Sequence, residues 1–190
     1  MESNKKGITL PEYLIAFSII GIISVMVAGI YFAHFRLFSN QNTAIDVSTQ
    51  NKLGLTEITN QVRQSQSVAA SCGACGADNS NATLLILQLW PIDNNGDPLD
   101  PGTTNYDYIV YKRNPTTTTN LIRITYPSGI SSRKSATHVV ATNISALAFT
   151  YNDPTPANAT QVTIAITTTA TVNGKTQTVT DMTKADLRNK

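Results

Sequence analysis

Two hydrophobic patterns follow one another in the first part of the chain, and both predict helix. Residues 13–33 carry no charged side chain and are predominantly apolar on every side of a helix. At 1.5 Å rise per residue, a helix over this stretch spans roughly 30 Å, which is the thickness of a bilayer core. The pattern therefore predicts a membrane-spanning helical segment over residues 8–35.

The second pattern, over residues 36–70, is amphipathic. Leu55, Ile58 and Val62 recur at helical spacing, with polar and charged side chains between them. No proline interrupts the stretch, and Gly54 is its one internal glycine. We expect one continuous helix over residues 9–69, whose second half buries one face against the rest of the protein.

Residues 71–190 change to the pattern of a β-rich domain. After a turn-rich break at residues 71–81, apolar or alternating runs predict strands. These runs cover residues 83–90, 106–112, 120–126, 139–140, 146–151, 161–172 and 176–180, and Asn173-Gly174 is a strong hairpin signal between the last two. Because no helix separates the strands, we expect an α+β fold: a long N-terminal helix packed on a C-terminal antiparallel β-sheet head.

Composition limits the classes of function. The net charge is +2 over 190 residues, and Arg133-Lys134 is too small a basic patch to predict nucleic-acid binding. The two histidines, His34 and His138, do not suggest a catalytic triad, and the chain has no glycine-rich phosphate loop. We therefore expect a protein that is not an enzyme, with no nucleic-acid partner and no cofactor beyond the calcium ion considered below.

A single carboxylate, Glu12, stands at the front of the apolar segment. An ionised carboxylate is costly in hydrocarbon, so its presence there requires a partner. Lys5 and Lys6 lie just before the segment, and basic residues mark the cytoplasmic side of a membrane helix. The amino end is therefore expected in the cytoplasm, and the head on the other side of the membrane.

The same residues carry a family resemblance. The run KGITLPE at residues 6–12 and the run IIGII at residues 19–23 resemble the prepilin signal and membrane segment of the type IV pilin and type II secretion pseudopilin superfamily. Ile8 replaces the commoner Phe, and Pro11 stands where Leu, Ile or Val is usual. A proline in the first helical turn lacks only an amide that would be unpaired anyway. The close resemblance covers residues 5–33.

Later residues resemble particular subgroups of this superfamily. Tyr111 followed by LIR at residues 121–123 is similar to a strand pair of J-type pseudopilins and W-type minor pilins. The ending LRN at residues 187–189 is similar to that of many minor pilins. The resemblance therefore points to a minor subunit.

The resemblance implies a maturation site at the amino end. Residues 1–7 correspond to a leader that a prepilin peptidase removes after Lys6-Gly7, and the new amino group of Ile8 is then methylated. Glycine at the cleaved position allows an enzyme to approach the backbone closely. The mature chain is expected to begin at Ile8.

The resemblance also implies the partners and the location. The expected partners are the prepilin peptidase, other pilin or pseudopilin subunits, the inner-membrane assembly platform and membrane lipid. Glu12 is expected to pair with the Ile8 amino group of a neighbouring subunit or of its own chain, where it sets the register of assembly. The chain would first span the inner membrane once, and then join an extracellular or periplasmic filament with residues 8–35 in the fibre core.

Other interpretations of the amino end stay open at this point. Val27-Ala28-Gly29 fits the cleavage site of an ordinary signal peptide, but the apolar stretch is longer than a usual signal core and Glu12 interrupts it. An uncleaved, membrane-anchored β-rich binding or adhesion module would keep residues 1–7. An anchored enzyme is a third possibility, although nothing in residues 71–190 resembles an active site.

Cys72-Gly-Ala-Cys75 admits several chemistries. A redox CxxC normally opens a helix that lowers the pKa of one thiol, whereas this motif enters a loop. A zinc site needs further ligands, and histidines are scarce in the chain. Because the head is expected outside the cytoplasm, a structural Cys72–Cys75 disulfide is the favoured interpretation, with free thiols, redox chemistry and metal binding as alternatives.

Asp93, Asn95 and Asp97 place oxygen ligands at alternating positions, as calcium-binding loops do. The stretch lacks the full twelve-residue pattern and its closing glutamate. The same residue types also form polar turns. The sequence leaves a calcium site and a simple turn as alternatives.

Overall fold

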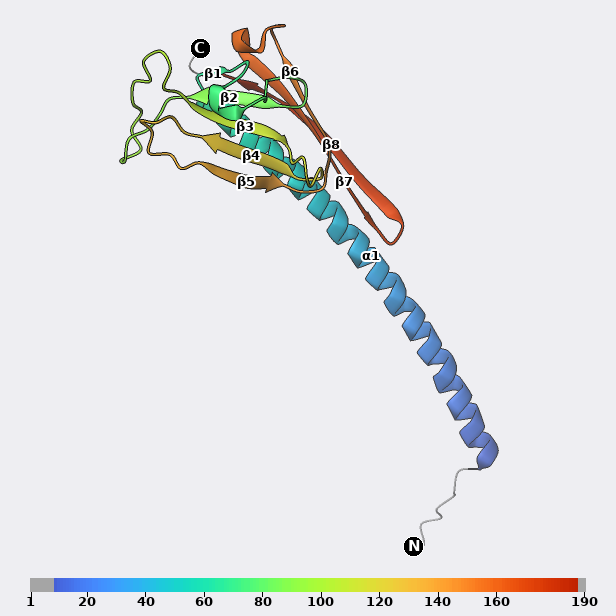
Figure 1. Ribbon diagram of the computed structural model, residues 1–190. Helices are drawn as coiled ribbons and strands as arrows, with labels where there is room; N and C mark the ends of the chain where they lie inside the picture. The colour runs from blue at the N-terminus through green and yellow to red at the C-terminus, as the bar shows by residue number, and fades with distance from the viewer. Residues whose placement is uncertain (1–8, 188–190) are drawn as a thin grey trace. The chain divides into compact units, whose positions relative to one another are not determined.

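The structure, a computed structural model, describes residues 9–187, which form one α-helix, two short 3-10 helices and eight strands (Figure 1). The chain divides into two compact units, Met1–Asn42 and Thr43–Lys190. The helix α1 (Leu10–Gln64) contributes residues to both units, and all the strands belong to the second.

The 55-residue helix α1 is continuous, as predicted, but the predicted end at residue 69 is wrong. The hydroxyl of Ser65 donates to the carbonyl of Val62 at 2.7 Å, which competes with continuation of the helix. The backbone amide of Gln66 then donates to the carbonyl of Gln88 at 2.9 Å. The next residues therefore form a short strand, β1 (Ser67–Val68), instead of another helical turn.

A five-stranded antiparallel sheet has its strands in sequence order, β1-β2-β3-β4-β5. Strands β2, β3 and β4 lie close to the predicted runs, whereas β5 is longer than the predicted residues 139–140. Thr137 and His138 are exposed and give β5 no apolar alternation, so its pairing with β4 defines this edge strand. The bounds are β2 (Leu85–Leu89), β3 (Asp107–Arg113), β4 (Leu121–Tyr126) and β5 (Ala136–Ala141).

A second, three-stranded antiparallel sheet has the order β6-β7-β8, with β6 (Ile144–Tyr151), β7 (Gln161–Val172) and β8 (Lys175–Asp186). The predicted hairpin at Asn173-Gly174 is confirmed. Both residues have positive φ, 50° and 74°, as a tight two-residue hairpin turn requires. β8 continues beyond the predicted residue 180 because β7 offers a partner along its whole length.

The second half of α1 packs in one core with both sheets. Ile58 and Val62 are completely buried and Leu55 is nearly so. Their cluster includes Leu87 of the five-stranded sheet and Ile164 of the three-stranded sheet. Complete burial of such an aliphatic side chain stabilises a fold by roughly 1.5–3 kcal/mol. The fold class is therefore α+β, as predicted, with the helix packed against antiparallel sheets.

α1 approaches both sheets closely at Gly54. A Cβ atom at this position would lie 3.0 Å from Cδ1 of Ile166 in β7 and 3.2 Å from Cδ2 of Leu121 in β4. Both distances are shorter than ordinary van der Waals contact, so a larger residue would require its neighbours to shift. The internal glycine of the amphipathic stretch thus sets the spacing between helix and sheets.

A buried polar link joins α1 to the three-stranded sheet. The side chain of Asn51 is completely buried, and its Nδ2 donates to the carbonyls of Ile166 at 2.8 Å and Val179 at 3.1 Å. The hydroxyl of Thr168 donates in return to the carbonyl of Val47 at 2.9 Å. Buried polar groups are costly unless paired, so these bonds fix the helix against β7 and β8 in one arrangement.

Candidate functional site

The first half of α1 presents a long apolar surface that the protein itself does not cover. Every side chain between residues 10 and 38 is exposed. Phe17, Ile23 and Phe32, for example, are 66%, 54% and 65% exposed. Apolar surface of this extent marks a site that contacts a membrane or another protein.

By length and composition, α1 can cross a membrane, and no residue of its most apolar stretch is buried within the protein. A membrane anchor and a signal sequence near the amino terminus both fit this description. This apolar surface is therefore the principal candidate for function.

Glu12 lies in the first turn of α1 and caps the helix. Its Oε2 accepts hydrogen bonds from the backbone amide of Thr9 at 3.3 Å and from the Thr9 hydroxyl at 3.4 Å. The spacing Thr9-x-x-Glu12 is that of a capping box, and Pro11 fits the first turn because no helical bond needs its amide. Sequence reasoning had not considered this local partner for the carboxylate.

The predicted maturation site cannot be compared with this geometry. Lys6, Gly7 and Ile8 lie outside the described residues, so cleavage, methylation and the pairing of Glu12 with the Ile8 amino group stay predictions. Glu12 and Thr9 are exposed, which leaves the carboxylate accessible to a second partner.

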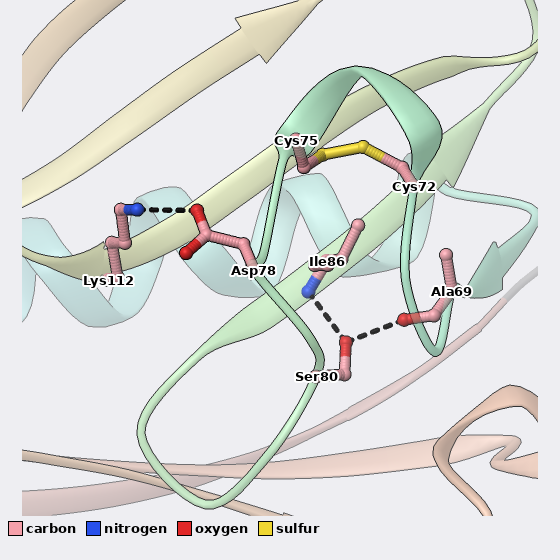
Figure 2. The surroundings of a disulfide bond; sticks show 7 residues. All are labelled: Ala69, Cys72, Cys75, Asp78, Ser80, Ile86 and Lys112. Atoms are coloured by element: carbon pink, nitrogen blue, oxygen red, sulfur yellow. Dashed lines mark hydrogen bonds and ion pairs between the residues drawn. A yellow bond between two sulfur atoms is a disulfide. The ribbon is translucent and has the colours of Figure 1, made fainter.

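Cys72 and Cys75 are joined by a disulfide, with their Cα atoms 5.3 Å apart (Figure 2). The 3-10 helix η1 (Gly73–Cys75) brings the two residues together, and both are almost completely buried. They pack with Ile86 of β2 and Val110 of β3 in a second apolar cluster. Since β2 and β3 give their alternate residues to the helix-packed core, the disulfide loop covers the opposite face of the sheet.

Polar contacts hold this loop on the sheet. The hydroxyl of Ser80 donates to the carbonyl of Ala69 at 2.6 Å and accepts the amide of Ile86 at 3.0 Å (Figure 2). Asp78 forms an ion pair with Lys112 of β3 (Figure 2). The arrangement is that of a structural cover over this face of the sheet.

Asp93, Asn95 and Asp97 lie in one tight turn. Oδ1 of Asp93 accepts the backbone amides of Asn95 at 2.8 Å and Asp97 at 2.9 Å. The hydrogen bond from the Asp97 amide is the main cause that lowers the pKa of Asp93. Within residues 9–187, no group of three or more His, Cys, Asp or Glu side chains is placed to hold a metal ion. The geometry is that of an Asx turn, and calcium binding stays a prediction.

A partly buried charge cluster connects α1 to the five-stranded sheet, and sequence reasoning did not find it. Glu57 of α1 lies 2.5 Å from a terminal nitrogen of Arg123 in β4, and accepts the hydroxyl of Tyr111 in β3 at 3.3 Å. Burial is the main cause that raises the pKa of Tyr111 strongly, and the nearby negative charge of Glu57 is the second cause. Tyr111 and Arg123 were singled out from the sequence by resemblance alone, and nothing in the pattern indicated Glu57 as their partner.

A fully buried carboxylate, Asp107 at the start of β3, organises the loops beside it. It accepts the backbone amide of Ser128 at 2.8 Å and the hydroxyl of Ser131 at 2.7 Å. Nε of Arg133 lies 3.0 Å from the same carboxylate. Arg133, noted in the sequence for its charge, is therefore partly neutralised within the protein.

The candidate residues do not converge on one centre. Glu12 belongs to the first unit, whereas the disulfide and the Asp93 turn belong to the second. Each of them has a local partner that explains its geometry without a reaction.

No protein-family model matches the sequence, and no curated protein matches it either. The architecture is nevertheless pilin-like, with a long N-terminal apolar helix packed on a C-terminal antiparallel sheet.

Proposed function

We propose that the chain is a structural subunit, a minor pilin or pseudopilin, of a type IV pilus or a type II secretion-like filament. The observation that carries this proposal is the uncovered apolar half of α1 in a chain whose second unit has a complete core of its own. A helix that is apolar on every side needs an apolar environment, and a bundle of like helices supplies one as well as lipid does. The resemblance of residues 5–33 to a prepilin signal supports the same assignment.

The proposed mechanism is transfer of α1 from the membrane into a fibre core. Residues 8–35 exchange lipid for equivalent contacts with neighbouring helices, so the apolar surface stays out of water throughout. The second unit keeps its fold during this transfer because its core does not depend on the exposed half. The proposed partners are thus a prepilin peptidase, the inner-membrane assembly platform, lipid and other subunits.

Glu12 is proposed to direct this assembly. Its hydrogen bonds to Thr9 satisfy a helix end but do not neutralise its charge. In a low-dielectric core that charge requires a cation, and the amino group of a processed Ile8 provides one. An ion pair of this kind fixes axial register more than it stabilises. The chain itself is proposed to perform no catalysis.

The first experiment measures the amino-terminal mass after coexpression with a prepilin peptidase. We expect a chain that begins at a methylated Ile8, and we expect Gly7→Val to block the cleavage, because a side chain at the cleaved position prevents close approach. An intact leader in the presence of active peptidase would instead favour the uncleaved, membrane-anchored binding module, which the exposed apolar helix supports equally well.

The second experiment separates the two partners of Glu12. Glu12→Gln should abolish incorporation into filaments, whereas Thr9→Ala removes only the hydroxyl contact of the cap and should still assemble. Assembly is scored by the amount of chain in sheared filaments, with the membrane-bound amount as the reference. Equal impairment by the two substitutions would reduce Glu12 to a helix-capping residue.

A further inference from the structure

A hollow of about 520 Å³ in the second unit is not used by the assembly function. The end of α1, the end of β2 and two loops surround it, and its polar and aromatic lining consists of Gln64, Gln66, Trp90 and Arg133. Its size falls within the range of roughly 300–1,000 Å³ that is usual for small-molecule sites. None of these residues belongs to the exposed apolar half of α1.

Trp90 supplies an accessible flat apolar face. It follows β2 directly, is the single tryptophan of the chain, and is 42% exposed at the edge of the hollow. The indole ring of a partly exposed tryptophan offers a ligand a flat apolar face beside a polar N–H group. Leu89 and Ile92, on either side of it in the sequence, extend the apolar part of the lining.

Gln66 supplies an unused hydrogen-bond acceptor. Its side-chain Oε1 is buried and has no hydrogen-bond partner among the described residues. The backbone of Gln66 is fixed by its bond to the Gln88 carbonyl, so the side chain is anchored beside β2. A buried unpaired acceptor is costly, and the hydroxyl of a ligand would satisfy it once the Gln66 side chain turns from its buried position toward the hollow that it lines. Gln64 adds a second carboxamide at the rim.

The wall of the hollow is fixed before any ligand arrives. Gly96 and Pro98 line it, and they are held by the Asp93 turn, in which the Asp97 carbonyl also accepts the Asp93 amide at 2.9 Å. Ser132 ties this turn to the neighbouring loop by donating its amide to the carbonyl of Ile92 at 2.8 Å. The residues that suggested calcium in the sequence therefore shape a wall of this hollow.

Charge decides the class of ligand. Arg133 faces the hollow, but the buried carboxylate of Asp107 lies 3.0 Å from its Nε and offsets its charge. The carboxylates of Asp93 and Asp97 belong to the adjoining turn and are not part of the lining. A site with donors, acceptors and little net charge favours a neutral, hydroxyl-rich ligand over an anion or a cation.

We propose that this hollow is a binding site for a neutral saccharide. One face of a pyranose ring, with its C–H groups, packs on Trp90. The ring hydroxyls donate to Oε1 of Gln66 and accept hydrogen bonds from Arg133 and from the carboxamide of Gln64. The inference goes beyond assembly and does not depend on it, because every residue involved belongs to the second unit.

The test uses the single tryptophan as its own reporter. The full chain is placed in phosphatidylcholine nanodiscs, which contain no sugar, and titrated to millimolar concentration with the methyl glycosides of glucose, galactose, mannose and N-acetylglucosamine. We expect a saturable change in Trp90 emission with at least one of them. The acyclic polyol sorbitol, which has hydroxyls but no ring, should give no saturable change.

Two variants test the roles of the residues. Gln66→Met keeps the size of the side chain but removes the acceptor, so it should weaken saccharide binding about tenfold, as expected for one lost hydrogen bond, while leaving the melting temperature equal or higher. Gln177→Met on β8, outside the hollow, is the matched control and should bind as the unchanged chain does. Trp90→Ala is assayed by saturation-transfer NMR and should abolish binding.

Some outcomes would overturn the proposal. Absence of a saturable emission change with all four glycosides would remove the saccharide as ligand. An emission change with peptides but not with saccharides would show that the hollow serves another class of partner. Unaltered affinity in Gln66→Met would contradict the proposed geometry even if a sugar binds.

Discussion

The two halves of α1 follow opposite rules of burial within one continuous helix. Between residues 10 and 38 every side chain is exposed, although nearly all are apolar. In the second half, the buried positions Val47, Asn51, Ile58 and Val62 recur along one face and meet two sheets. Both halves are helical, so helix propensity does not determine their environments. The distribution of apolar side chains around the helix determines them.

The two glutamates of the helix show the same contrast. Glu57 has a cation and a hydroxyl within its own chain, from Arg123 and Tyr111. Glu12 has only the neighbouring Thr9 among the residues that the structure describes. A charge that is satisfied internally belongs to the fold, and a charge that is not satisfied points to a partner outside it.

Truncation of one buried and one exposed isoleucine is expected to give the largest difference in stability between the two halves of α1. Ile58→Ala should lower the free energy of unfolding of the second unit by about 4 kcal/mol, because it leaves a cavity in the shared core. Ile23→Ala, in the exposed half, should change it by less than about 0.5 kcal/mol. Urea unfolding of the full chain, followed by Trp90 emission, measures both. A large effect of Ile23→Ala would mean that the stability of the second unit depends on the first half of α1.

High pH should weaken the buried half through Tyr111. Its pKa is raised in the folded state, whereas an unfolded chain releases the same proton near pH 10. Above about pH 10 the unfolded state therefore binds fewer protons, and stability falls as pH rises, by up to about 1.4 kcal/mol per pH unit.

Tyr111→Phe should flatten this decline while changing little at pH 7, where only the 3.3 Å hydrogen bond to Glu57 is lost. Urea unfolding at pH 9, 10 and 11 compares the slopes. Identical slopes in the variant and the unchanged chain would assign the decline to other groups.

Two glycines of α1 give the smallest and most specific contrast. Gly54→Ala should destabilise the second unit by about 1 kcal/mol, because overpacking against Ile166 and Leu121 outweighs the gain in helix propensity. Gly29→Ala meets no atom within 4 Å and should leave that unit unchanged. Thermal unfolding by circular dichroism distinguishes them. A stabilising Gly54→Ala would show that the neighbouring side chains can move aside.

The sequence was sufficient for those elements whose side-chain pattern is itself periodic. β7 was predicted at its observed bounds because its alternation is unbroken, and Asn173-Gly174 fixed the following turn. β1 was missed because Ser67 and Val68 continue an apparently helical stretch, and only their pairing with Gln88 and Leu87 makes them a strand.

For the candidate sites too, the distance along the sequence separates what was predicted from what was missed. Residues close in sequence were found, as Cys72 with Cys75 and Asp93 with Asp97. Contacts between distant residues were not, because Glu57 meets Arg123 across 66 positions and no local pattern records it. The hollow beside Trp90 was missed for the same reason, since Gln66 and Arg133 reach it from separate parts of the chain.

The position at which α1 enters the second unit determines where a fragment that contains this unit alone should begin. A fragment that starts at residue 71, where the β-rich region was expected to begin, would lack Ile58, Val62 and the rest of the helical face that both sheets share. The two sheets would then present apolar faces to water, and aggregation is the expected result. A fragment that starts at Thr43 keeps that face and omits the exposed apolar residues 10–38.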